Sequence, residues 1–163
     1  AFVLLSSHEP EQAKAQVDAY RTLAREALGR EVQIWTNAYV VHGDTQKEAE
    51  DYLHYYVVDK GDDVAVDLLA RTMELNAQTL PPGVFEQHKF HFKAGWGGYP
   101  LVGTADRITD ELLHLSKLGL DGVVLSWVDY FDGLERWRTR MMPRLEQAGL
   151  RRPCVPTSKS AIR

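Results

Sequence analysis

The sequence predicts an α/β fold with parallel strands, in the order β-α-β-α-α-loop-β-α-β-α. Short apolar runs rich in β-branched and aromatic residues alternate with longer segments whose apolar residues recur every three or four positions. The strand-like runs are apolar on both faces, as in buried parallel sheets. The 163 residues fit one domain and are fewer than the roughly 250 of a closed eight-stranded barrel. About four βα units can therefore form an open three-layer sheet or half of a barrel.

The composition is that of a folded globular protein, with 44% hydrophobic and 26% charged residues. The net charge of −4 argues against a nucleic-acid binder, and no apolar run reaches the roughly 20 residues of a membrane span. A single cysteine, Cys154, excludes an intrachain disulfide and a multi-cysteine metal site, and it fits a reducing cytoplasm. Because a strand-like run opens the chain at Ala1, we expect that sequence has been removed upstream.

The first half of the chain contains two predicted strands and three helices. Residues 1–5 form a buried strand, and a helix follows with Pro10 in its first turn and Gly29 at its end. Residues 32–41 form the second strand. Asp44 or Thr45 caps a helix that runs to about residue 57, and another helix starts at Asp62 or Asp63.

The second half begins with an irregular stretch at residues 81–99, rich in His, Phe, Gly and Trp. Leu101 and Val102 form a very short strand, and Thr104 caps a helix that Gly119 ends. Residues 122–127 form a strand buried on both faces, and a last helix covers about 133–148. The domain spans residues 1–153, and residues 154–163 form a flexible tail.

Three segments together resemble a known family: 95–104 (GWGGYPLVGT), 118–127 (LGLDGVVLSW) and 129–137 (DYFDGLERW). Their order and spacing resemble the C-terminal end of the bacterial-luciferase-like flavin-dependent monooxygenases. The branch of dimethyl-sulfone, alkanesulfonate and pyrimidine monooxygenases is the most similar. The resemblance covers residues 1–153.

The resemblance implies the C-terminal half of a TIM (β/α)8 barrel, about strands five to eight, in an enzyme that oxidises a small organic substrate with reduced FMN and O2. It implies that a separate NAD(P)H-dependent reductase supplies the flavin. The phosphate-binding turn of the family lies before the first strand of this chain, so the flavin site is incomplete here. Two alternatives stay open: a deazaflavin-dependent oxidoreductase of the same fold, and a non-catalytic half-barrel that forms homo-oligomers or associates with a missing half.

In such barrels, chemistry lies at the carboxyl ends of the strands. The predicted strand ends are Ser6-Ser7-His8, His42-Gly43, Gly103-Thr104 and Ser126-Trp127-Val128-Asp129. His8 and Trp127 are the catalytic candidates, His8 as a hydrogen-bond donor and Trp127 as an apolar wall of the substrate pocket. Ser6, Asn37 and Tyr39 are the candidate flavin contacts. The alternatives are a polar helix start for His8 and packing for Asn37, Tyr39 and Trp127.

Trp96, Gly97, Gly98 and Tyr99 form a candidate lid over the substrate, since glycines permit close backbone approach and Trp96 offers a flat surface. The alternative is an ordinary connecting loop. His88 and His91 lie near Glu86, but two histidines and a carboxylate do not complete a zinc site, and no metal is expected. Val128 replaces the Tyr that some relatives have beside the substrate, which argues against the same substrate pocket.

Overall fold

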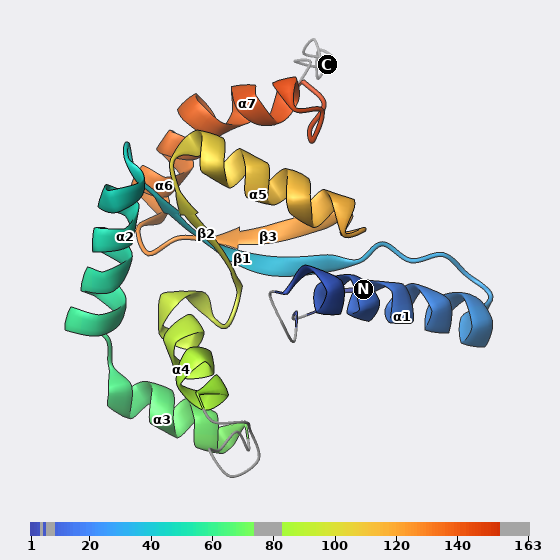
Figure 1. Cartoon of the computed structure of the whole chain (residues 1–163), viewed down its shortest axis with the longest axis horizontal. Helices are drawn as coiled ribbons and strands as arrows, with labels where there is room; N and C mark the ends of the chain where they lie inside the picture. Colours follow the sequence, from blue (N-terminus) through green and yellow to red (C-terminus); the bar gives the residue numbers. More distant parts are fainter. Residues whose placement is uncertain (4, 6–8, 74–82, 154–163) are drawn as a thin grey trace, which may run out of the picture.

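A computed structural model describes residues 1–3, 5, 9–73 and 83–153 of the chain. In this part, three parallel strands form one sheet: β1 (Trp35–His42), β2 (Tyr99–Gly103) and β3 (Gly122–Ser126). The strand order is β2-β1-β3, so β1 is the central strand (Figure 1). The prediction of parallel pairing is confirmed.

The register staggers the two outer strands along β1. Ala38 is paired with Tyr99 of β2, whereas Trp35 is paired with Gly122 of β3. The predicted first strand at residues 1–5 is reduced to one parallel bridge between Phe2 and Trp35. Residue 4 and residues 6–8 lie outside the described part, so the full extent of that strand is not defined.

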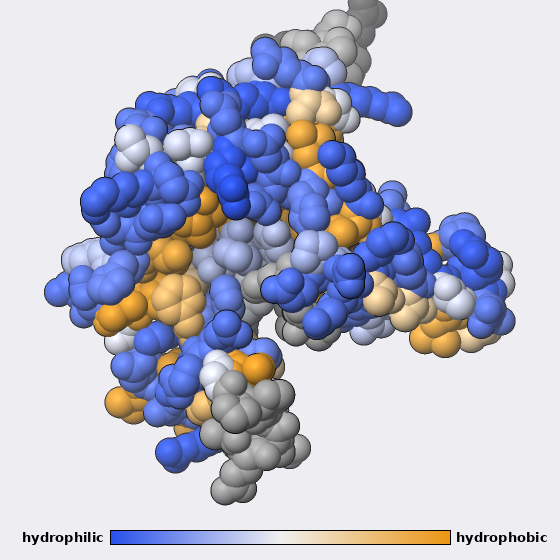
Figure 2. All heavy atoms as spheres, in the orientation of Figure 1, coloured by the Kyte–Doolittle hydropathy of each residue, from blue (hydrophilic) through white to orange (hydrophobic). Residues whose placement is uncertain are grey.

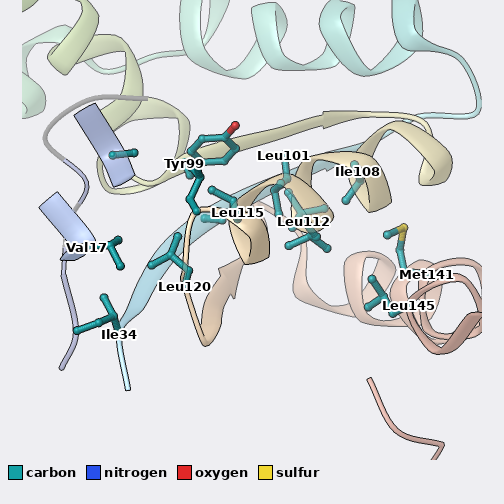
Figure 3. Close-up of a cluster of buried hydrophobic side chains, with 14 of the residues drawn as sticks. Val17, Ile34, Tyr99, Leu101, Ile108, Leu112, Leu115, Leu120, Met141 and Leu145 are labelled. Atoms are coloured by element: carbon teal, nitrogen blue, oxygen red, sulfur yellow. The ribbon is translucent and has the colours of Figure 1, made fainter. Parts of the chain in front are cut away.

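The larger core lies on one face of the sheet (Figure 3). It is built from the even-numbered side chains of β1 and their neighbours on β2, packed against α1 (Pro10–Leu28), α5 (Ala105–Lys117) and α7 (Met142–Gln147). Its buried members include Val17, Ile34, Tyr99, Leu101, Ile108, Leu112, Leu115, Leu120, Met141 and Leu145. On α5, the buried residues Ile108, Leu112 and Leu115 are three or four positions apart, so they lie on one side of the helix and face the sheet.

The smaller core lies on the opposite face, because alternate side chains of a strand point to opposite sides. It is formed by Tyr39 and Val41 of β1 with Ala49 of α2, Val57 of η1 and Ala94 of α4. The helices are α2 (Gln46–His54), the π-helix η1 (Tyr55–Asp59) and α4 (Val84–Gly95). Helices therefore cover both faces of the sheet, as Figure 1 shows.

Predicted helix starts agree closely with the structure. The side-chain oxygens of Thr45, Asp62 and Thr104 accept hydrogen bonds from Glu48 N, Ala65 N and Arg107 N at 3.1, 2.8 and 3.3 Å. These three residues directly precede α2, α3 (Asp63–Thr72) and α5, respectively. Each cap satisfies a backbone N–H that the first helical turn leaves free.

Three predictions about secondary structure are wrong. Within the stretch predicted as irregular, residues 84–95 form α4, since they contain no proline and no glycine before Gly95. The strand β3 is half-buried rather than buried, and Val124 is 51% exposed. The last helical segment begins earlier, at α6 (Tyr130–Arg136), and continues through the π-helix η2 (Trp137–Met141) into α7.

The surface is mostly hydrophilic, with apolar residues exposed at the far end of α1 and between α2 and α4 (Figure 2). Among the described residues, no helix is both long and apolar enough to cross a bilayer. The tail at residues 154–163, predicted as flexible, lies outside the described residues.

Candidate functional site

A mostly apolar cavity of about 500 Å3 opens on the face of the sheet that carries the smaller core, beside the part of β1 that α4 leaves uncovered. We call it the Asn37 cavity. Its lining residues are Phe2, Asn37, Met73, Phe92, Trp96, Val124, Leu125, Ser126 and Tyr130. Two of the residues predicted from the sequence, Asn37 and Trp96, thus meet in one cavity.

The turn that follows α4 closes one side of this cavity. Trp96 caps α4 in the left-handed conformation, with φ of 60°, and the residue is 65% exposed. The amide nitrogen of Asn37 donates a long hydrogen bond of 3.4 Å to the carbonyl of Trp96. Gly98 packs on β1, because a Cβ there would lie 2.9 Å from the Asn37 amide nitrogen. The glycine therefore lets the turn approach β1, which holds Trp96 at the rim of the cavity.

Tyr39, two residues along β1 from Asn37, is buried under α4. Its hydroxyl lies 3.1 Å from Nδ1 of His91, and burial raises the pKa of the phenol above its usual value of 10. Gly95 makes this packing possible, since a Cβ there would lie 2.2 Å from the Tyr39 Cβ. Tyr39 is therefore a protonated, hydrogen-bonded part of the wall between β1 and α4.

Tyr99, the last residue of the predicted lid, points to the opposite face of the sheet. Its side chain belongs to the larger core, and its hydroxyl donates a hydrogen bond of 2.8 Å to a carboxylate oxygen of Glu111 on α5. Gly97 adopts φ of 72°, which favours glycine. The four candidate lid residues are therefore divided between the cavity rim and the core.

A second cavity, of about 370 Å3, lies beyond the carboxyl ends of β1 and β3. We call it the strand-end cavity. It is lined by Val40, Val41, His42, Glu48, Tyr52, Trp127, Val128, Asp129, Asp132, Gly133 and Arg136. Trp127, the predicted substrate-pocket wall, lies here, and its ring packs edge-on against Tyr130 with centroids 5.7 Å apart. Because Tyr130 lines the Asn37 cavity, this ring pair lies between the two cavities.

His42 is the half-buried titratable side chain at the end of β1. Burial is the main cause that lowers the pKa of its imidazole, and the nearby guanidinium of Arg136 and that of Arg140 lower it further. Nδ1 of His42 is buried and has no hydrogen-bond partner among the residues that the structure describes. The neutral imidazole therefore keeps hydrogen-bonding capacity that these neighbours do not use.

Three arginines spaced by four residues lie along the segment from α6 to α7, and Arg136 lines the strand-end cavity. Arg136 pairs with Asp132 at 2.8 Å, Arg140 pairs with Asp44, and Arg144 pairs with Asp106 at 2.5 Å. The Arg140 and Arg144 pairs join the segment from α6 to α7 to the residues that begin α2 and α5, whereas the Arg136 pair lies within α6.

The other candidates in the described part of the chain do not line these two cavities. Ser6 and His8 lie outside the described residues, so their predicted roles stay predictions. Nδ1 of His88 donates a hydrogen bond of 3.1 Å to the carbonyl of Val84, and His91 contacts Tyr39. Within residues 1–3, 5, 9–73 and 83–153, no cluster of three metal-ligating side chains occurs.

Comparison with known proteins gives relatives of one chemical type. The chain is 27% identical over 161 residues to an FMNH(2)-dependent dimethylsulfone monooxygenase of Pseudomonas fluorescens, a match that covers 93% of this chain and 42% of the relative. No protein-family model matches the sequence. Over most of its length, the sequence of this chain is therefore similar to those of FMNH(2)-dependent dimethylsulfone monooxygenases. The family resemblance seen in the sequence is confirmed.

Solved structures give the same fold. Riboflavin lyase (RcaE), determined with modified FMN and riboflavin, matches with a TM-score of 0.69 and 21% identity over 91% of this chain and 39% of its own. DmoA from Hyphomicrobium sulfonivorans matches with a TM-score of 0.68 and 21% identity over 91% of this chain and 37% of its own. The chain spans about two fifths of these proteins, and the prediction of a partial barrel is confirmed.

The strand order departs from an uninterrupted arc of a barrel. In such an arc, strands pair in chain order, and β2 would lie between β1 and β3. Here β3 pairs with the edge of β1 that lies opposite β2. This pairing creates the strand-end cavity between β1 and β3, which the sequence did not predict.

His42 was not among the site residues predicted from the sequence. The sequence placed it at a strand end, but nothing local distinguished it from His88 or His91. Its unpartnered Nδ1 and its position near Arg136 and Arg140 arise from segments about 90 residues later in the chain. The available signal was its position directly after an apolar strand.

Proposed function

We propose that this chain forms part of a flavin-dependent monooxygenase that oxidises a small organic substrate with reduced FMN and O2. The observation that supports this most is the similarity to FMNH(2)-dependent monooxygenases over almost the whole chain. Because the chain spans 42% of the first of these relatives, the activity is proposed for the assembled enzyme. A separate NAD(P)H-dependent reductase is the proposed source of the reduced flavin.

The Asn37 cavity fits the ring system of a flavin. Its volume of about 500 Å3 suits a planar ligand, and Phe92, Trp96 and Tyr130 supply aromatic surface. The amide of Asn37 and the hydroxyl of Ser126 are polar groups that can bond to ring carbonyls and nitrogens. With the described residues, these side chains make long hydrogen bonds of 3.4 Å to backbone carbonyls, so they can reorient toward a ligand.

Reduced FMN supplies the oxygen-activating chemistry when it is bound. The residues of this chain would orient the ring through Asn37 and exclude water with the apolar wall of Trp96 and Phe92. Trp127 would separate this ring from the substrate, as its contact with Tyr130 indicates. Ser6 and His8 are the proposed contacts for the remainder of the cofactor and for the substrate.

Titration of FMN with the purified chain, followed by flavin fluorescence quenching, tests the proposal. We expect saturable binding that Trp96→Ala weakens about three- to ten-fold, since one aromatic stacking contact is removed. Tyr20→Ala, an exposed aromatic on α1, is the matched control and should leave the affinity unchanged. Absence of FMN binding, or equal binding by the Trp96 variant, would count against this flavin site. The same titration with a deazaflavin separates the two cofactor classes.

A second candidate is a binding module that associates with another copy or another chain. Large apolar side chains are exposed around α6, among them Phe131, which is 93% exposed, Val128 and Leu134. We propose on this basis that the chain forms homo-oligomers or pairs with a complementary half-barrel, in the cytoplasm. Size-exclusion chromatography showing a monomer at high concentration, unaffected by Phe131→Ser, would contradict association through this surface.

A further inference from the structure

A cavity of about 420 Å3 opens on the larger-core face of the sheet, beside α5 and α7, which lie side by side there (Figure 1). We call it the Arg151 cleft. Its apolar walls include Leu112 and Leu115 of α5, Trp137 of η2, Leu145 of α7, and Val123 and Leu125 of β3. The cleft lies on the opposite face of β3 from the Asn37 cavity, although Leu125 lines both. It shares no lining residue with the strand-end cavity.

The cleft exists because β3 is an edge strand whose larger-core face is only partly covered. The helix α5 packs on β2, and α7 packs on α5, so neither helix closes over β3. Val123 and Leu125 pack against the larger core and stay half-buried. Because removal of apolar surface from water is favourable, an apolar ligand body lying on these two side chains would be stabilised.

Two tryptophan rings border the cleft. A Cβ at Gly122 would lie 2.6 Å from Cε3 of Trp35, so the glycine allows this ring to lie against the first residue of β3. The ring of Trp137 packs edge-on against that of Trp127, with centroids 5.7 Å apart. These contacts hold both indoles in place beside the cleft, and an aromatic body would find ring surfaces to pack on.

The charged side chains that line the cleft are Asp121 and Arg151. Asp121 is already engaged, because its Oδ2 accepts hydrogen bonds of 2.8 Å from the Arg21 guanidinium and from Ile34 N. The ion pair of Asp121 with Arg21 is therefore neutral toward a ligand of either sign. Arg151 is exposed and pairs with no carboxylate among the described residues, and its Nη1 contacts the thioether of Met142, which is a weak acceptor.

The cleft thus carries one uncompensated positive charge beside an apolar floor. A carboxylate gains a charge-assisted hydrogen bond from the guanidinium of Arg151, an ammonium is repelled by it, and a hydroxyl gains a weaker, uncharged bond. Because Arg151 is exposed, water and salt weaken these effects. The expected preference for a carboxylate over an ammonium is therefore modest, about three- to ten-fold.

We propose that the Arg151 cleft binds a small amphipathic carboxylate. The apolar body lies on Val123 and Leu125 between α5 and α7, and the carboxylate pairs with Arg151. The volume of about 420 Å3 and the mostly apolar walls fit a ligand of this class. The site goes beyond the proposed flavin function and does not depend on it, since none of these contacts involves the Asn37 cavity apart from Leu125.

Three probes with the same phenyl ring and chain but different head groups test the proposal: phenylbutanoate, phenylbutanol and phenylbutylamine. Each is titrated into the isotope-labelled full chain at neutral pH, and the indole N–H signals of its four tryptophans are followed by NMR. We expect shifts at Trp35 and Trp137 and none at Trp96. The carboxylate should bind about three- to ten-fold more tightly than the amine, with the alcohol between them, and high salt should reduce this difference.

Two substitutions test the part played by the guanidinium. Arg151→Gln should bring the affinities for the carboxylate and the amine to within about two-fold of each other, because the charge is lost, while the affinity for the alcohol stays unchanged. The matched control is Arg152→Gln, since Arg152 is an exposed neighbour that does not line the cleft. The control should keep the preference of the unmodified chain.

The outcomes separate this site from the flavin proposal. Binding of phenylbutanoate at Trp35 and Trp137 in a chain that does not bind FMN would support the cleft and count only against the flavin function. No binding of any probe, equal binding of the two ions, shifts at Trp96 alone, or a preference retained in Arg151→Gln would each overturn the inference. Binding that occurs only when the chain is ended after Pro153 would also overturn it, because the occupant would then be the chain's own last residues.

Discussion

The hydroxyl of Tyr39 lies 3.1 Å from Nδ1 of His91, and this contact joins the central strand to α4. It lies beneath the turn that carries Trp96 to the rim of the Asn37 cavity. Because α4 rests on β1 at Tyr39, the packing of these two elements sets the position of the rim.

Gly95→Ala should destabilise the protein by about 1–3 kcal/mol, because the added methyl would lie 2.2 Å from the Cβ of Tyr39 and overpack the smaller core. Urea denaturation measures the change in the free energy of unfolding. Gln87→Ala, at an exposed position of α4, is the control and should change it by less than about 0.5 kcal/mol. Equal stabilities of the two variants would contradict the close contact.

The stability should fall above about pH 10. Burial raises the pKa of Tyr39 and Tyr56, and burial together with the Glu111 carboxylate raises that of Tyr99. Since the unfolded chain ionises these phenols near pH 10 and the folded chain does not, their stabilising contribution is present below that pH and is lost as the pH rises. Absorbance titration should show that only the exposed tyrosines ionise before unfolding. Full ionisation of all tyrosines in the folded state would contradict this.

Acid should weaken the fold through His42. The pKa of its imidazole is lowered in the folded state, so below about pH 6.5 the unfolded chain takes up a proton that the folded chain refuses. We expect the free energy of unfolding to decrease between pH 6.5 and the lowered pKa. His42→Gln should reduce this pH dependence, and His54→Gln should not. Identical pH profiles for the two variants would show that His42 does not carry the effect.

Asp129→Ala should cost about 1 kcal/mol of unfolding free energy, because its carboxylate caps α6 through hydrogen bonds to Phe131 N and Asp132 N. Thermal denaturation followed by circular dichroism is the measurement. Asp129→Asn retains an accepting oxygen and should restore most of the loss, and Asp110→Ala, on an exposed part of α5, should have no effect. An equal loss in all three would point to charge rather than capping.

Local features of the fold could be predicted from the sequence. The caps at Thr45, Asp62 and Thr104 were predictable because a cap depends on a side chain and a backbone N–H within three residues of each other. The end of α1 at Gly29, with φ of 62°, follows from the same kind of local rule. These local rules alone allowed either an open sheet or half of a barrel. The resemblance to a known family favoured the half-barrel.

Features set by distant segments could not be predicted. The pairing of β3 with β1 joins residues more than 80 positions apart, and no local pattern specifies which edge is taken. For the same reason, the sequence did not show that Gly95 and Gly98 lie against β1, where an added Cβ would meet Tyr39 or Asn37. Asn37 and Trp96 were predicted as site residues from the strand alternation and from the glycine-rich composition around Trp96. That both line one cavity could be seen only in the folded structure.

The contact of Gly95 with Tyr39 has an evolutionary consequence. A Cβ at 95 would meet the Cβ of Tyr39, which every residue except glycine carries, so a larger residue at 95 requires β1 and α4 to move apart. Such a movement would also shift the turn that bears Trp96, and with it the mouth of the Asn37 cavity. Inheritance of a glycine at 95 therefore protects the shape of a cavity that neither position 39 nor position 95 lines.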